Sequence, residues 1–185
     1  MKTSQNLLAL FNTAVLFTLI LYFVSCQAKT QTQDDGPAKR LRDMGVELPE
    51  MSAPVANYVK YVKTGNLLFL SGHGACEEGK PGKVGSDLTI EEGYEAARLT
   101  GLCMLSTLHH AVDGDWSRVK QIVKVLGMVN SSPDFYEQPK VVNGCSDLMV
   151  EVFGEKGKHA RAAVGMASLP GNIPIEIEMI VELTE

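Results

Sequence analysis

The sequence predicts an α+β domain in which a sheet of five to six strands carries two helices packed on one face. Three observations indicate this fold. Residues 175–183 alternate between apolar and mostly acidic side chains, the period-2 pattern of a half-buried strand. Thr89-Ile-Glu-Glu92 is a capping box, and apolar residues recur after it every three or four positions, as in an amphipathic helix. Read along the chain, the elements follow the order β-β-α-β-α-β-β.

Turn and cap residues set the bounds of the individual elements. Lys63-Thr-Gly-Asn66 is a turn between an alternating segment and a short apolar run, which predicts a β-hairpin. Pro139 starts the second helix, because proline suits the first helical turn, and Gly154 or Gly157 ends it. The expected elements are a short helix at 37–44, strands at 57–62, 67–71, 121–129 and 175–183, a six-turn helix from 89, a helix from 139, and a short strand opened by Arg161.

The two predicted helices can cover only one face of this sheet. The other face carries Val, Phe and Ile residues, which favour burial over exposure. Symmetric association with further copies of the chain is the simplest way to bury them.

Charge and cysteine content argue against two kinds of site. The net charge is −5 and no basic block stands out, so a nucleic acid partner is not expected. The four cysteines form neither a C-x-x-C pair nor a cluster with zinc-site spacing, so no metal site is expected. They are Cys26, Cys76, Cys103 and Cys145. Cys103 and Cys145 fall on apolar helical patterns and are expected in the core. So few cysteines argue against a disulfide scaffold, although the sequence leaves a disulfide open.

The N-terminal residues differ from the rest of the chain. Leu7–Val24 is a largely apolar run of 18 residues, which predicts a secretory or lipoprotein signal at 1–25 and also just reaches the length of a membrane anchor. Phe23-Val24-Ser25-Cys26 resembles a bacterial lipobox, in which the cysteine is lipidated, but Phe23 replaces the usual leucine. Lipoprotein, secreted and membrane-anchored forms stay open, and all three are extracytoplasmic. Residues 26–36 predict a flexible tether, and the domain spans 37–185.

Arg161 and the acidic strand that follows it allow two interpretations. In one, the glutamates form the solvated face of an edge strand. In the other, Arg161 and one glutamate face a common pocket, because two short strands joined at residues 170–172 would lie side by side.

Several motifs occur in one order between Pro54 and Glu185. They are Asn57-Tyr58-Val59, the hairpin Thr64–Gly72, Asp134-Phe135, and the stretch from His159-Ala-Arg161 through Leu169-Pro170 to Ile175-Glu176-Ile-Glu178. In these motifs the chain resembles the RidA/YjgF family of reactive-intermediate deaminases, also named endoribonuclease L-PSP. The segments around residues 85–93 and 138–157 resemble a less-studied branch of that family.

The resemblance implies a chorismate-mutase-like fold and a homotrimer whose sheets form a central barrel with the helices outside. It implies three clefts, each between neighbouring subunits, and a hydrolase without a cofactor. The implied reaction converts enamines and imines derived from 2-amino acids, such as 2-aminoacrylate, into 2-keto acids and ammonia.

The resemblance also implies roles for individual residues. Arg161 matches the arginine that binds the substrate carboxylate, a role that suits its planar guanidinium. Glu176 matches the glutamate that positions or activates water. Gly72 would offer its backbone carbonyl to the substrate nitrogen. The remaining positions implied in or near the cleft are Tyr58, Ser71, Asn143 and Ala163.

Two departures leave the activity open. Ala163 stands where the deaminases often carry cysteine, whose main-chain N–H alanine also supplies, and His73 replaces a common glutamine in the implied cleft wall. The alternative function is therefore a non-catalytic trimeric binder of small carboxylate metabolites. A structural surface protein also remains, whereas the acidic composition and the lack of a basic-aromatic groove argue against a ribonuclease.

Overall fold

The structure is a computed structural model that describes residues 36–76 and 79–184. The predicted signal at 1–25, the lipidation candidate Cys26 and all but the last residue of the tether lie outside these residues. Within the described part of the chain, no helix combines the length and the apolar character that crossing a membrane requires.

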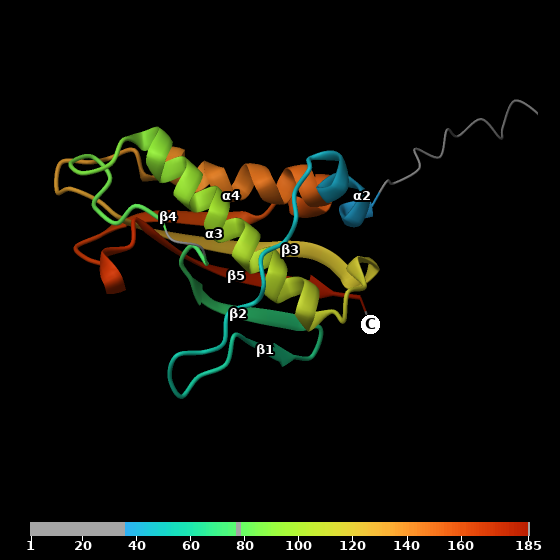
Figure 1. Ribbon diagram of the computed structural model, residues 1–185. Helices are drawn as coiled ribbons and strands as arrows, with labels where there is room; N and C mark the ends of the chain where they lie inside the picture. The colour runs from blue at the N-terminus through green and yellow to red at the C-terminus, as the bar shows by residue number, and fades with distance from the viewer. Residues whose placement is uncertain (1–35, 77–78, 185) are drawn as a thin grey trace, which may run out of the picture. The chain divides into compact units, whose positions relative to one another are not determined.

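A five-stranded sheet organises the domain, in the order β1-β2-β5-β3-β4 (Figure 1). β1 and β2 form the predicted hairpin, and β5 runs antiparallel between β2 and β3. β4 lies at the edge, parallel to β3. The strands are β1 (Tyr61–Thr64), β2 (Leu67–His73), β3 (Val119–Asn130), β4 (Ala160–Met166) and β5 (Ile175–Leu183). The predicted α+β class is confirmed, with five strands.

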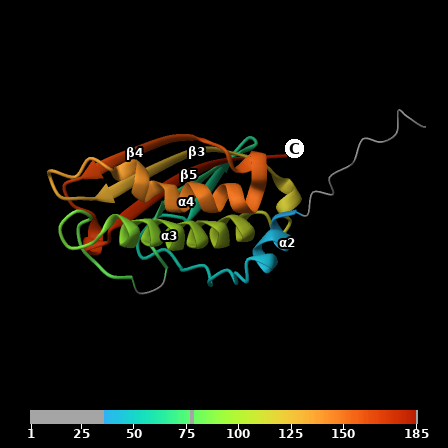
Figure 2. The ribbon, with the colours of Figure 1, turned by 90° about the horizontal axis from the view of Figure 1, so that it is seen from above.

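Helices α3 (Ile90–Ala111) and α4 (Gln138–Phe153) lie side by side on one face of the sheet (Figures 1 and 2). The predicted capping box is present at Thr89, whose hydroxyl accepts a hydrogen bond from the N–H of Glu92. Gly144 permits the close approach of the two helices, because a Cβ there would overlap a backbone carbonyl of α3. The predicted two-helix layer is therefore confirmed.

Four shorter helices complete the domain. The predicted helix near residue 37 is α2 (Gly36–Asp43), where Arg40 donates a hydrogen bond of 3.1 Å to the Val152 carbonyl oxygen of α4. The three others are short 3-10 turns, η1 (Trp116–Arg118), η2 (Gly154–Gly157) and η3 (Pro170–Asn172).

The core lies between the sheet and the helix layer. Strand residues that face the helices are almost fully buried. Along β5 they alternate with more exposed residues, as the alternating sequence of this strand predicts. They include Leu68, Leu70, Ile122, Val125, Val129, Ile175, Ile177, Met179, Val181 and Leu183.

The opposite face of the sheet lacks a covering layer in the single chain. It exposes Val62, Phe69 and Val164, with 55%, 40% and 39% of their surface open to solvent. Figures 1 and 2 show both long helices on the other side. The sequence-based expectation of an uncovered apolar face is therefore met.

Both interpretations of the acidic strand are wrong about its neighbours: β5 is not an edge strand, and it does not lie beside β4. These strands follow each other in sequence, but β3 lies between them and pairs with both. The linker through η3 therefore crosses the end of β3 at Asn130 instead of forming a tight hairpin. The parallel direction of β3 and β4 is explained by α4, which connects them as a crossover helix.

The expectation that Cys103 is a simple core thiol is also wrong. Cys103 is buried on α3, but it forms a disulfide with Cys76, in the loop after β2, across a sequence separation of 27 residues. Cys145 is free and buried, as predicted.

The disulfide should contribute measurably to stability. Replacing Cys76 and Cys103 together by serine should lower the free energy of unfolding by about 2–4 kcal/mol, because the unfolded chain loses a loop constraint. Urea denaturation of both proteins measures this difference. The same urea midpoint for the oxidised wild type and the double variant would contradict the prediction, and reductant should shift only the wild type.

Candidate functional site

Arg161 is held between β4 and α4. Its Nη1 donates hydrogen bonds to Oδ1 of Asn143 (2.8 Å) and to Oγ of Ser146 (3.0 Å), which lie three residues apart on α4. The Arg161 side chain nevertheless remains exposed. Ala163 follows two residues later on β4 and packs against the core on the helix side. The structure thus brings together three predicted residues, Arg161, Asn143 and Ala163, and adds Ser146.

A second group of predicted residues surrounds the end of β2. The pairing of β2 with β5 shifts register between Leu70 and His73, so Ser71 and Gly72 form a bulge. A Cβ at Gly72 would overlap Oε1 of Glu176. The glycine therefore lets the Glu176 carboxylate lie directly against the backbone of the bulge.

The segment before β1 flanks this bulge. The N–H of Ser71 donates to the carbonyl oxygen of Lys60 (2.9 Å), and the Ser71 hydroxyl donates to that of Val59 (2.6 Å). Tyr58 immediately precedes Val59, and 43% of its surface is exposed. Ser71, Gly72 and Glu176 therefore lie together, and Tyr58 is next in the chain to Val59, which accepts the hydrogen bond from Ser71.

His73 fixes the bulge from the helix side. Its Nδ1 lies 2.6 Å from the Ser71 carbonyl oxygen and its Nε2 lies 2.9 Å from Oγ1 of Thr107 on α3. A carbonyl can only accept, so Nδ1 carries the proton and Nε2 accepts from Thr107. Burial lowers the pKa of His73, and the charge of Lys60 lowers this pKa further, so the ring is neutral at pH 7. The resemblance implies His73 in the cleft wall; in the single chain its ring is buried and bonds to Thr107 on α3.

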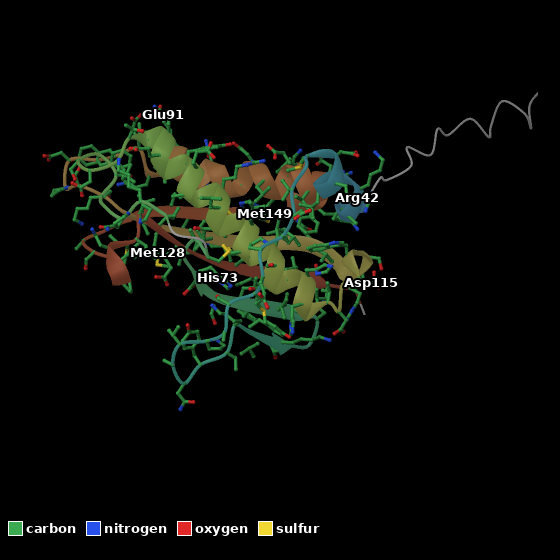
Figure 3. All side chains as sticks on the ribbon, in the orientation of Figure 1. Arg42, His73, Glu91, Asp115, Met128 and Met149 are labelled. Carbon is green, nitrogen blue, oxygen red and sulfur yellow. A yellow bond between two sulfur atoms is a disulfide. The ribbon has the colours of Figure 1, made fainter. Side chains whose placement is uncertain are left out.

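The two groups lie on opposite faces of the sheet. Arg161 is in register with Val125 of β3, which faces the helices and is fully buried. Glu176 is in register with Met128, three residues further along β3 and on the other face. Figure 3 shows Met128 on the side of the sheet away from α4. The single chain therefore forms no pocket shared by Arg161 and Glu176.

We call the two groups the arginine half-site (Arg161, Asn143, Ala163 and Ser146) and the glutamate half-site (Glu176, Ser71, Gly72 and Tyr58). One strand, β3, lies between β4, which carries Arg161, and β5, which carries Glu176, so the half-sites are on different strands as well as on different faces. A ligand touching both would have to lie between two copies of the chain.

A separate cleft of about 580 Å³ lies between the first half of α3 and the start of β5. Its walls are mainly apolar, with Leu88, Leu99 and Ile173 among them, and it contains no residue of either half-site. Over residues 36–76 and 79–184, the structure has no cluster of three or more His, Cys, Asp or Glu side chains suited to a metal ion.

Comparison with known proteins identifies the class to which this fold and these half-sites belong. Residues 38–183 match the family model described as "YjgF/chorismate mutase-like, putative endoribonuclease". The chain belongs to this YjgF/RidA family, so the predicted membership is confirmed.

Three relatives from different organisms have similar sequences. Protein TCP17 of Trypanosoma cruzi is 45% identical over 153 residues, which cover 79% of this chain and 93% of TCP17. The crystal structure of Atu1372 from Agrobacterium tumefaciens, a protein of unknown function, is 43% identical with a TM-score of 0.75, covering 83% of this chain and 96% of Atu1372. A Shewanella oneidensis structure that carries the endoribonuclease label is 38% identical with a TM-score of 0.76, covering 80% and 99% of the two chains.

The neutral state of His73 predicts how stability depends on pH. Because the pKa of His73 is lower in the folded chain than in the unfolded one, its contribution is complete above about pH 6.5 and is lost as the pH falls. The free energy of unfolding should therefore decrease from pH 7.5 to pH 5, by at most about 1.4 kcal/mol per pH unit for this group. Urea denaturation at several pH values measures the slope.

The variant His73→Gln removes the titrating group and should show a shallower pH dependence. His109→Gln, which changes an exposed histidine at the end of α3, is the matched control and should keep the wild-type slope. Identical slopes for wild type and His73→Gln would show that His73 does not govern acid sensitivity.

Proposed function

We propose that this protein is a RidA-like deaminase that hydrolyses enamines and imines derived from 2-amino acids to 2-keto acids and ammonia. The observation that carries the proposal is the state of Arg161. Both hydrogens of its Nη1 are used by Asn143 and Ser146, whereas its Nη2 and Nε have no hydrogen-bond partner among the described residues. The free edge can donate two parallel hydrogen bonds to a carboxylate.

The proposed enzyme is a homotrimer whose clefts join the arginine half-site of one subunit to the glutamate half-site of the next. Two observations support this assembly. The half-sites lie on opposite faces of the sheet in one chain, and the face that carries Glu176 also exposes Phe69 and Val164. Association through this face would bury the apolar side chains and supply the second half of each cleft.

In the proposed reaction, an enamine first tautomerises to the imine, and water adds across the C=N bond, so that the carbon gains a hydroxyl and the nitrogen a proton. The hydroxyl proton then moves to the nitrogen as the C–N bond breaks, which leaves the keto acid carbonyl and releases ammonia. Arg161 holds the substrate carboxylate, and the Glu176 carboxylate accepts a hydrogen bond from the attacking water. The carbonyl of Gly72 orients the substrate nitrogen. Positioning of this kind suffices for a reaction that already proceeds in water.

We also propose that the domain works outside the cytoplasm, as a secreted, lipidated or membrane-anchored protein. The disulfide between Cys76 and Cys103 supports this location, because such bonds persist in oxidising compartments. The apolar run Leu7–Val24 and the lipobox-like Cys26 point the same way.

The same location favours a second candidate function. Enamines formed by cytoplasmic enzymes are not expected in an oxidising compartment, so the clefts would there bind a small carboxylate metabolite without turnover. Binding of a 2-keto acid by a protein that does not accelerate imine hydrolysis would distinguish this function from the deaminase.

The deaminase proposal predicts a large effect of Arg161. Arg161→Ala should lower kcat/KM for 2-iminopropanoate, generated in situ from alanine, by about ten- to a hundredfold, the size expected from losing a charged hydrogen bond worth about 1.5–3 kcal/mol. The assay follows keto acid formation by the full chain. Arg118→Ala, which removes an arginine of η1 that pairs with Asp113 at 3.0 Å, is the matched control and should retain activity. A wild-type rate equal to that of buffer would refute the deaminase.

A further inference from the structure

Ser146 is bonded on both sides. It accepts from Nη1 of Arg161 at 3.0 Å, and its Oγ lies 3.1 Å from Nε2 of His159. His159 directly precedes β4, so it comes from the same edge of the sheet as Arg161. The three side chains therefore form a continuous chain of contacts from the strand end, through α4, to the guanidinium.

The carbonyl oxygen of Gly157, at the end of this chain of contacts, determines the direction of each hydrogen bond in it. Nδ1 of His159 lies 2.6 Å from the carbonyl oxygen of Gly157, which can only accept, so Nδ1 carries a proton. In the neutral ring Nε2 is then an acceptor and receives the hydroxyl proton of Ser146. The Ser146 oxygen thereby turns its lone pairs toward the N–H of Arg161.

We propose that Ser146 and His159 are positioning residues, which together with Asn143 hold Nη1 of Arg161 so that its Nη2–Nε edge faces the ligand carboxylate. This inference rests on the proposed role of Arg161 in carboxylate binding. Neither residue touches the ligand. Their function is to fix the rotation of the guanidinium, since a bidentate pair tolerates little misalignment.

The charges near this chain of bonds favour the arrangement. Burial lowers the pKa of His159, and the positive charge of Arg161 lowers this pKa further, so Nε2 stays an acceptor at pH 7. Burial also raises the pKa of the Cys145 thiol to about 12, so no thiolate competes for Arg161. Lys158, the neighbouring cation in sequence, is engaged by Glu155 at 2.7 Å.

The first arm of the test needs no ligand. In the full chain, nitrogen-15 NMR of His159 should show the proton on Nδ1 near neutral pH, and Arg161→Ala should raise the pKa of His159, because a neighbouring cation is removed. Ser146→Ala should move the Nε2 chemical shift, because the ring loses its donor. Unchanged His159 spectra in both variants would overturn the inference.

The second arm measures the affinity for a carboxylate. Pyruvate is titrated into wild type, Ser146→Ala and His159→Phe, with Ser146→Thr and His159→Gln as controls that keep a hydroxyl or an acceptor in place. The Kd for pyruvate should rise about five- to tenfold in the first two variants and stay near the wild-type value in the controls. In turnover assays the same variants should raise KM more than they lower kcat, since ground-state binding is what they weaken.

The outcomes separate this inference from the proposed function. Pyruvate binding that weakens as stated, in a protein that hydrolyses no imine, would refute the deaminase and support the positioning role. Wild-type hydrolysis with unchanged Kd and KM in Ser146→Ala and His159→Phe would support the deaminase and overturn the positioning role. A wild type that neither binds pyruvate nor hydrolyses the imine would overturn both.

Discussion

The place of β3 between β4 and β5 is the constraint on which the candidate site depends. Both neighbouring strands pair with β3. The residue of β3 that pairs with Arg161 and the residue that pairs with Glu176 are three positions apart. An odd shift changes the face of the sheet. The same pairing that builds a continuous core therefore divides the candidate site residues of one chain between two surfaces. We propose that a second copy of the chain supplies the missing half.

Each half-site is anchored to the helix layer in the same way. His73 and His159 both donate from Nδ1 to the carbonyl two residues earlier, and both accept at Nε2 from a helix hydroxyl, Thr107 on α3 or Ser146 on α4. Burial lowers the pKa of both rings, which keeps them neutral and preserves these donor and acceptor roles. One ring fixes the bulge beneath Glu176, and we propose that the other fixes the guanidinium of Arg161.

Local patterns predicted most of the fold, because caps, turns and alternation report on neighbours in sequence. They predicted the capping box at Thr89, the hairpin and the alternating strand β5. They did not predict that β3 separates β4 from β5, since strand order depends on which segments pair over long distances. For the same reason the disulfide of Cys103 was missed, as were the contacts of Ser146 and His159. A serine on the polar side of a helix and a histidine before a strand carry no local signal of their meeting.

We propose that each working cleft takes Arg161 from one subunit and Glu176 from another. Co-expressing Arg161→Ala and Glu176→Gln chains with different tags yields mixed trimers, which can be purified through both tags and assayed for 2-iminopropanoate hydrolysis. Every mixed trimer would contain one cleft with both residues intact, so we expect about one third of the wild-type rate from two parents of much lower activity. Mixed assemblies no more active than their parents would contradict the shared cleft.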